Sequence, residues 1–331
     1  MRVWSLLALL SVVTARADEP PRLEAAITRG LARIERGSLN YTANRACFSC
    51  HHQMALPVLA LAKQKGFAVS EGNLFIQQEF TRETFRPKLD RIRQGQGVGG
   101  ANATAAYALF VLEAAGQEPD ETTDGLVDFL TVRQAADGSW PAVTERPPTE
   151  GSPFTNAALA LRALRVYGFE AESTDAKRRK KIKASWQRGR EWLKSSAPAT
   201  TEDRAFHLRA LVEAEFERAA IKSARDELIR AQRRDGGWAQ LPKMESDAYA
   251  TAIVLTALQR AGVSRDDAAV RKGILYLLET QKEDGSWFVQ TRSRPVQTFF
   301  DNGDPGGKSQ FISFAATNWA TLALLQHFER R

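Results

Sequence analysis

The chain has 331 residues, of which 43% are apolar and 26% are charged, and its formal net charge is +7. This composition is that of a folded globular protein, and the positive charge is mild for the length. The one dense basic run, residues 177–183, contains no aromatic residue. We therefore expect a solvated helix face there and no nucleic-acid partner.

The first residues have the pattern of a secretory signal. Arg2 gives a positive start, residues 3–13 form an apolar run, and Ala15-Arg16-Ala17 is a small-x-small cleavage site. We expect residues 1–17 to be a signal peptide, the mature protein to begin near Asp18, and its location to be secreted or periplasmic. The apolar run is too short to span a bilayer, so no stable membrane insertion is expected.

Both cysteines of the chain lie in the segment "ACFSCHHQM", residues 46–54, where Cys47 and Cys50 are followed by His51 and His52. If this segment is helical, the i, i+3, i+4 spacing places Cys47, Cys50 and His51 on one face. His52 then points roughly 100° away from His51. A protein of this size can bury a sufficient core without disulfides, so the pair needs a local explanation.

Helical patterns alternate along the rest of the chain. One set is rich in alanine and leucine on nearly every face, which predicts burial all round; it comprises residues 48–65, 101–116, 154–168, 202–216, 246–262 and 314–328. The other set is charged on one face and is expected to be an outer layer; it comprises residues 21–36, 70–94, 122–134, 178–195, 222–233 and 266–282. The alternation predicts six helical hairpins.

Three copies of Q-x-x-D-G-x-W accompany these helices: Gln134 to Trp140, Gln232 to Trp238 and Gln281 to Trp287. Their tryptophans are 98 and 49 residues apart, which indicates a period of about 49 with a degenerate copy near residues 186–196. In each copy Asp-Gly is expected to make a tight turn after an outer helix, with the Trp buried beneath it.

The copies resemble the repeat of squalene-hopene cyclases and of prenyltransferase β-subunits. The resemblance implies an all-α, closed (α/α)6 toroid over residues 18–331, in which each Gln and Trp ties one hairpin to the next. The pairing of "CFSCHH" with "DAYATA" and "GGKSQFISFAATNWATLAL" further resembles a group of exported bacterial squalene-cyclase-like proteins.

The catalytic motif of that family has no counterpart in this sequence. Class II triterpene cyclases use Asp-x-Asp-Asp at the opening of an inner helix as the proton donor, and the nearest matches here are Asp203 and Asp247. Each is a single acid at a helix start, where N-capping is the expected role. The zinc ligands of prenyltransferase subunits are also not matched, because this chain has no separated cysteine.

C-x-x-C-H is the attachment sequence of haem c, so we expect Cys47 and Cys50 to hold a haem and His51 to bind its iron. His207 and Met244 are candidates for the opposite iron ligand. Two alternatives remain: a disulfide or redox-active dithiol, and a zinc site made of Cys47, Cys50, His51 and a fourth group such as Asp247.

Three loops complete the pattern. The glycine-rich stretch "GQGVGGAN", residues 95–102, follows a helix, so we expect a flexible connection in place of a phosphate loop. The insertions 141–153 and 288–311 are expected at the cysteine end of the ring, the second covering it. The sequence thus favours an exported toroid with haem c that serves an apolar small molecule or a redox partner. The alternatives are a terpenoid cyclase with an unusual acid and a binding module.

Overall fold

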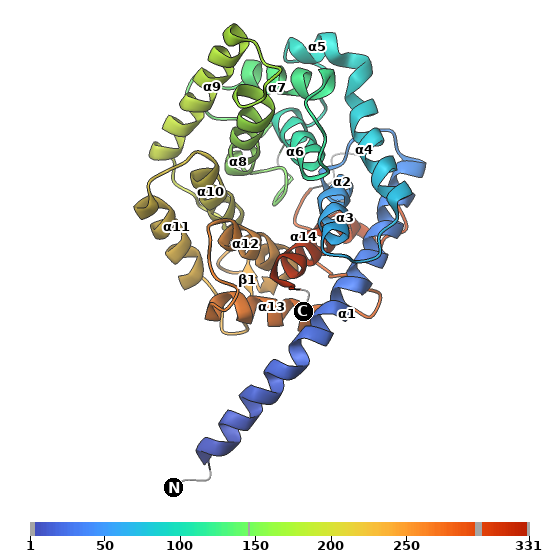
Figure 1. Cartoon of the computed structure of the whole chain (residues 1–331), viewed down its shortest axis with the longest axis vertical. Coiled ribbons are helices and arrows are strands. Elements are labelled where there is room, and N and C mark those ends of the chain that lie inside the picture. The colour runs from blue at the N-terminus through green and yellow to red at the C-terminus, as the bar shows by residue number, and fades with distance from the viewer. Residues whose placement is uncertain (1–3, 145, 295–299, 330–331) are drawn as a thin grey trace.

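Two concentric layers of helices alternate along the chain, as Figure 1 shows. The computed structural model describes residues 4–144, 146–294 and 300–329. The inner layer contains α2 (Cys50–Gln53), α3 (Ala55–Gln64), α6 (Ala101–Ala114), α8 (Pro153–Ala163), α10 (Thr201–Glu213), α12 (Ala248–Arg260) and α14 (Gln310–His327). The outer layer contains α1 (Trp4–Asn44), α4 (Glu71–Phe85), α5 (Leu89–Arg93), α7 (Glu121–Arg133), α9 (Ala176–Ser195), α11 (Arg218–Arg230) and α13 (Ala268–Thr280).

Five short elements lie between or beside these helices. They are the 3₁₀ turns η1 (Arg86–Lys88) and η3 (Gly307–Ser309), the π-helical end of α8, η2 (Leu164–Phe169), and the two-residue strands β1 (Trp238–Ala239) and β2 (Ser246–Asp247). The strands pair antiparallel and join the turn region of the second Q-x-x-D-G-x-W copy, Gln232 to Trp238, to the start of α12.

The inner helices form a closed ring. Around it α3 packs on α6, α6 on α8, α8 on α10, α10 on α12, α12 on α14, and α14 on α3 again. The alanine-rich pattern explains this burial, since every residue of α12 from Ala248 to Leu258 is buried. The prediction of an all-α (α/α)6 toroid is confirmed.

The Q-x-x-D-G-x-W copies hold neighbouring hairpins together. Each Gln side chain donates both to the carbonyl of its own turn glycine and to a carbonyl of the next outer helix: Gln134 to Ser185, Gln232 to Ala269 and Gln281 to Ala26. Each Trp indole donates to a carbonyl of the preceding outer helix, at 2.8 Å in every copy. These bonds confirm the structural role expected for the motif.

The centre of the ring is filled at the level of Arg209. Its guanidinium lies 5.5 to 5.6 Å from the ring centroids of Phe110, Phe206 and Trp319, which come from three inner helices. Phe110 of α6 and Trp319 of α14 stack across the ring with centroids 6.4 Å apart. All four side chains are buried, and burial lowers the pKa of Arg209 to about 10.

Some boundaries differ from the sequence prediction. The first outer helix continues to Asn44, and its N-terminal part projects away from the ring in Figure 1. The last inner helix begins at Gln310, before the expected residue 314. Among the described residues, no helix combines the length and apolar character that crossing a membrane requires. Residues 1–3 of the expected signal peptide lie outside the described residues.

Candidate functional site

The C-x-x-C-H segment lies at the start of the first inner helix, but only part of it is helical. α2 begins at Cys50, and Ser49 precedes it with extended backbone angles. Cys47 therefore stands before the helix, and the expectation that all three residues share one helical face is wrong for Cys47. Both thiols are free; Cys47 is exposed, whereas Cys50 is buried.

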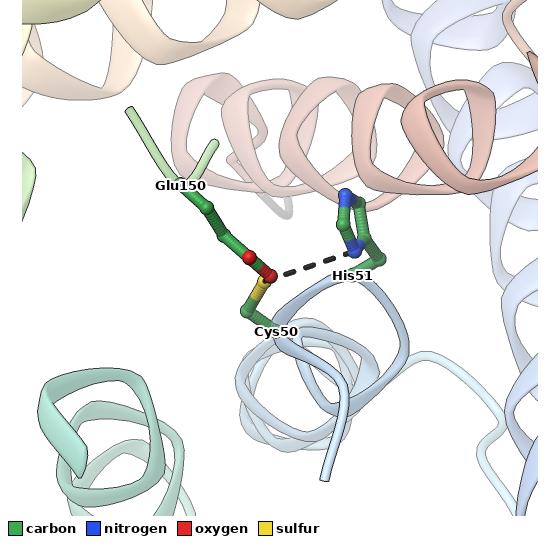
Figure 2. Close-up of side chains that lie close together, drawn as sticks. All are labelled: Cys50, His51 and Glu150. Atoms are coloured by element: carbon green, nitrogen blue, oxygen red, sulfur yellow. Dashed lines mark hydrogen bonds between the residues drawn. The ribbon is translucent and has the colours of Figure 1, made fainter. Parts of the chain in front are cut away.

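Cys50, His51 and Glu150 form a cluster whose ligand atoms all lie within 4.8 Å of one another. Figure 2 shows the carboxylate of Glu150 reaching α2 from the loop before α8. The sulfur of Cys50 is 3.5 Å from Oε1 of Glu150 and 3.7 Å from Nδ1 of His51. A thiol, an imidazole nitrogen and a carboxylate oxygen thus converge on one point.

The loop that carries Glu150 also holds the His51 ring. Oγ1 of Thr149 lies 3.2 Å from Nε2 of His51, so a neutral ring with its proton on Nε2 directs the Nδ1 lone pair at Cys50. Arg146 pairs with the other oxygen of Glu150 at 3.5 Å. Insertion 141–153 therefore reaches the cysteines, as the sequence indicated.

Burial controls the protonation of the cluster. It lowers the pKa of His51 to about 4, so the imidazole is neutral near pH 7. Burial, with a further contribution from the Glu150 carboxylate, raises the pKa of the Cys50 thiol well above its usual value. In this state the protonated thiol of Cys50 donates a hydrogen bond to Glu150. A bound cation would favour the thiolate form of Cys50 in place of the thiol.

His52 anchors the second insertion. Its Nε2 lies 3.1 Å from Oδ2 of Asp304, whose Oδ1 pairs with Arg33. The ring stacks between Tyr41 and Phe314, with centroids 4.1 and 4.5 Å away. Because His52 and Asp304 are both buried, this contact fixes segment 302–304 against α2. Of insertion 288–311, residues 295–299 lie outside the described residues.

A cavity of about 360 Å³ adjoins the cluster. Cys47 and Glu150 both line it, together with Lys88, Arg146 and the glycine-rich loop. The phenol oxygen of Tyr41 lies 3.3 Å from the Cys47 sulfur. The exposed thiol of Cys47 and the cluster of Cys50, His51 and Glu150 therefore border the same cavity, the latter through Glu150.

The two acids proposed as proton donors both stabilise helix starts. The N-cap role expected from the sequence holds for Asp247 but not for Asp203, which is the N3 residue of a capping box whose N-cap is Thr200. Asp203 accepts hydrogen bonds from the amide of Thr200 and from the hydroxyl of Ser152, in the capping box of α10. Asp247 is the N-cap of α12 and accepts from the Ala250 amide at 2.9 Å. Its Oδ2 is buried without a partner among the described residues, and burial raises its pKa to about 6.

Glu202, which the sequence analysis did not single out, is a buried acid in the first turn of α10, next to Asp203. It accepts from Thr155 of α8 at 2.7 Å and from Tyr249 of α12 at 3.0 Å. Burial raises its pKa to about 8. Its place beside Asp203 was the only signal, because spacing alone does not tell which of two adjacent residues faces inward.

His207 and Met244, the proposed distal iron ligands, make other contacts. The His207 ring packs edge-on against Phe154, with centroids 5.4 Å apart, and burial lowers its pKa. The amide of Met244 donates to Leu241. Within the described ranges, no hydrogen bond and no cluster of metal-ligand atoms joins either residue to Cys47, Cys50 or His51.

Residues 208–330 match the family described as squalene-hopene cyclase C-terminal domain. No curated protein matches the chain in a sequence comparison. Among solved structures, a variant of the type II terpene cyclase MstE from Scytonema, in complex with geranylgeranyl dihydroxybenzoate, is 16% identical with a TM-score of 0.58 and covers 94% of this chain and 99% of its own. A glycosidase in complex with glucose is 11% identical with a TM-score of 0.61 and covers 93% and 97%.

The ent-copalyl diphosphate synthase from Streptomyces platensis is 18% identical with a TM-score of 0.53, covering 83% of this chain and 50% of that one. Identities this low show the fold alone. The chain therefore has an α/α toroid fold similar to that of these terpene cyclases, and the glycosidase match shows that the same fold also supports other activities.

Proposed function

We propose that this terpene-cyclase-like toroid is a metal-dependent protein whose centre is formed by Cys50, His51 and Glu150. The supporting observation is the convergence of three ligand atoms of different chemistry, from two segments, at the end of the inner ring. Sulfur, imidazole and carboxylate ligands together favour zinc among the common divalent ions.

The distances agree with this assignment. A tetrahedral zinc ion with ordinary bond lengths separates its sulfur ligand from a nitrogen or oxygen ligand by about 3.6 Å. The Cys50 sulfur lies 3.7 Å from Nδ1 of His51 and 3.5 Å from Oε1 of Glu150. Thr149 supplies the hydrogen bond that orients the imidazole, as partners of metal-bound histidines usually do.

The donor set leaves one position of a tetrahedron open. Three protein ligands with an open position are typical of catalytic zinc, which acidifies a bound water and polarises carbonyl or phosphoryl oxygens. Glu150 also lines the adjacent cavity, so that position would be reached from there. The neighbouring Cys47 and the earlier candidate Asp247 are not part of the cluster, and Glu150 takes their place.

Haem c is the second candidate, favoured by the order C-x-x-C-H and by the cavity beside Cys47. It needs both sulfurs and the His51 ring at one macrocycle. Here the Cys50 sulfur faces Glu150, and Nε2 of His51 faces Thr149. Haem attachment would require the loop carrying Thr149 and Glu150 to move away, whereas a metal ion requires no such movement.

One set of variants separates the two candidates. The full chain is produced in a host with the cytochrome c maturation machinery, purified, equilibrated with zinc, dialysed and assayed for zinc by mass spectrometry and for covalent haem by staining a denaturing gel. The variants are Cys47→Ser, Cys50→Ser and Glu150→Gln, with Glu172→Gln as an exposed control. Circular dichroism checks that each variant is folded.

The metal centre predicts stoichiometric zinc in the unaltered chain, in Cys47→Ser and in Glu172→Gln, and its loss in Cys50→Ser and Glu150→Gln. Haem c predicts a stained band in the unaltered chain. The band should be lost in Cys47→Ser and in Cys50→Ser and should remain in Glu150→Gln. Zinc that is absent from the folded, unaltered chain, or retained by Glu150→Gln, would overturn the proposed metal centre.

A further inference from the structure

We propose that the cavity beside Cys47 binds the anionic group of a substrate, a phosphate or carboxylate attached to a small apolar body. This substrate class rests on the proposed metal centre, which Glu150 connects to the cavity. The volume of about 360 Å³ is in the range of sites for small organic molecules.

The charges on the cavity wall favour an anion. Lys88 and Arg146 line it, and Glu150 is its one acidic lining residue among those the structure describes. Arg146 pairs with Glu150, but its Nε is buried with no described partner. A metal ion bound to Glu150 would compete with Arg146 for the carboxylate charge, so the guanidinium would be available to an incoming anion.

The glycine-rich loop adds backbone donors to the same wall. Gly97 and Gly100 have φ of +80° and +76°, a conformation that favours glycine. Across the described part of the chain, no carbonyl accepts a hydrogen bond from the amides of Gly97, Gly99 or Gly100. Gly100 is also the N-cap of α6 and offers no side-chain cap, so the amides that follow Ala101 are open to a ligand, whereas the Ala101 amide itself donates to Val98.

Aromatic side chains form the apolar part of the cavity. Phe48 and Phe85 both line it, and their ring centroids are 5.8 Å apart. Phe85 is 2% exposed, so its position is set by packing beneath the cavity. An anion with an apolar body would place its charge near Lys88 and the glycine loop and its body against these rings.

Two sources could supply this chemistry: a free organic anion, or the propionates of a haem attached at Cys47. The test is calorimetric titration of phenyl phosphate into the full chain, in zinc-loaded, zinc-free and, where it forms, haem-bearing states. Phenol is the neutral control ligand. The variant is Lys88→Gln, and Lys243→Gln makes the same charge change on an exposed loop outside the cavity.

We expect phenyl phosphate to bind, phenol not to bind at the same concentrations, and Lys88→Gln to weaken phenyl phosphate about tenfold, the usual worth of one charge-assisted hydrogen bond. Lys243→Gln should bind like the unaltered chain. Binding by the haem-free chain that disappears in the haem-bearing chain would support an anion site in this cavity but would overturn a free substrate as its occupant in the haem-bearing protein.

Equal binding of phenol and phenyl phosphate, no binding in any state, or unchanged affinity in Lys88→Gln would overturn the anion site. Zinc content measured on the same samples keeps the two proposals apart. A chain that holds zinc but ignores phenyl phosphate contradicts the substrate class alone. A chain that binds phenyl phosphate without retaining zinc contradicts the metal centre alone.

Discussion

The sulfur of Cys50 lies 3.5 Å from Oε1 of Glu150, although 100 residues separate them in the chain. The contact joins the start of the first inner helix to the loop that leads into α8. It explains why Cys50 and Cys47 differ, since one thiol is buried against a carboxylate and the other is exposed beside a cavity. The two cysteines therefore need not share one role.

The hydrogen bond between Thr149 and His51 leads to the first prediction. Thr149→Val keeps the shape of the side chain but removes the hydroxyl that lies 3.2 Å from Nε2 of His51. The ring then loses the partner that fixes its tautomer and orientation, and zinc affinity should fall by about 10- to 100-fold. Competition with a chromophoric chelator measures this affinity.

Thr174→Val is the matched control for that measurement. Thr174 is as buried as Thr149, at 5% exposure, and its hydroxyl has no described hydrogen-bond partner. It should leave zinc affinity unchanged. If Thr149→Val binds zinc as tightly as this control, Thr149 does not orient a metal ligand.

The ring of helices could be predicted because its determinants repeat. Helical periodicity marked the inner and outer layers, and the three Q-x-x-D-G-x-W copies marked where hairpins join. The first two copies join hairpins that are close in the chain, as Gln134 does by bonding its own turn and the next outer helix, whereas Gln281 bonds Ala26 of α1 where the ring closes. Most of the architecture could therefore be predicted from the repetition of these features at a fixed period.

The site was less predictable because its contacts do not repeat. Glu150 reaches Cys50 from an irregular loop, and Asp304 reaches His52 from another, so no sequence period links the partners. Glu202 and Asp203 are adjacent acids, and only packing decides that Glu202 faces Thr155 and Tyr249. Such pairings depend on ring closure, which a single sequence pattern does not specify.

The repeat turns give a second prediction, about stability. Gly236 has φ of +86°, and an added Cβ would lie 2.6 Å from the Lys272 carbonyl oxygen on the next outer helix. Gly236→Ala should cost about 1–2 kcal/mol for the left-handed backbone, and about 1–3 kcal/mol more for the overlap with α13. Denaturant unfolding measures the sum.

Gly262→Ala separates the two contributions to that cost. Gly262 has a similar φ of +77°, but an added Cβ there meets no atom within 4 Å. It should show only the backbone cost. Equal destabilisation by Gly236→Ala and Gly262→Ala would contradict this explanation. It would mean that Gly236 is needed for its backbone conformation and not for the close packing of the turn against α13.

Glu202 gives a third prediction, on pH dependence. Burial raises its pKa from 4.5 to about 8, so the folded state holds a proton that the unfolded state has released across that interval. Stability from this group is fully present below pH 4.5 and is lost as the pH rises through 8. Between those values the free energy of unfolding should fall by about 1.4 kcal/mol per pH unit from Glu202 alone.

Glu202→Gln tests this directly, because the amide resembles the protonated acid and can still bond Thr155 and Tyr249. Urea unfolding from pH 6.5 to 8.5 avoids the protonation of His51 and His52, whose pKa values burial lowers below 6.5. The unaltered chain and the exposed control Glu172→Gln should lose stability across this range, while Glu202→Gln should not. Parallel curves for all three would show that Glu202 is already ionised in the folded protein, and that its bonds to α8 and α12 do not depend on a retained proton.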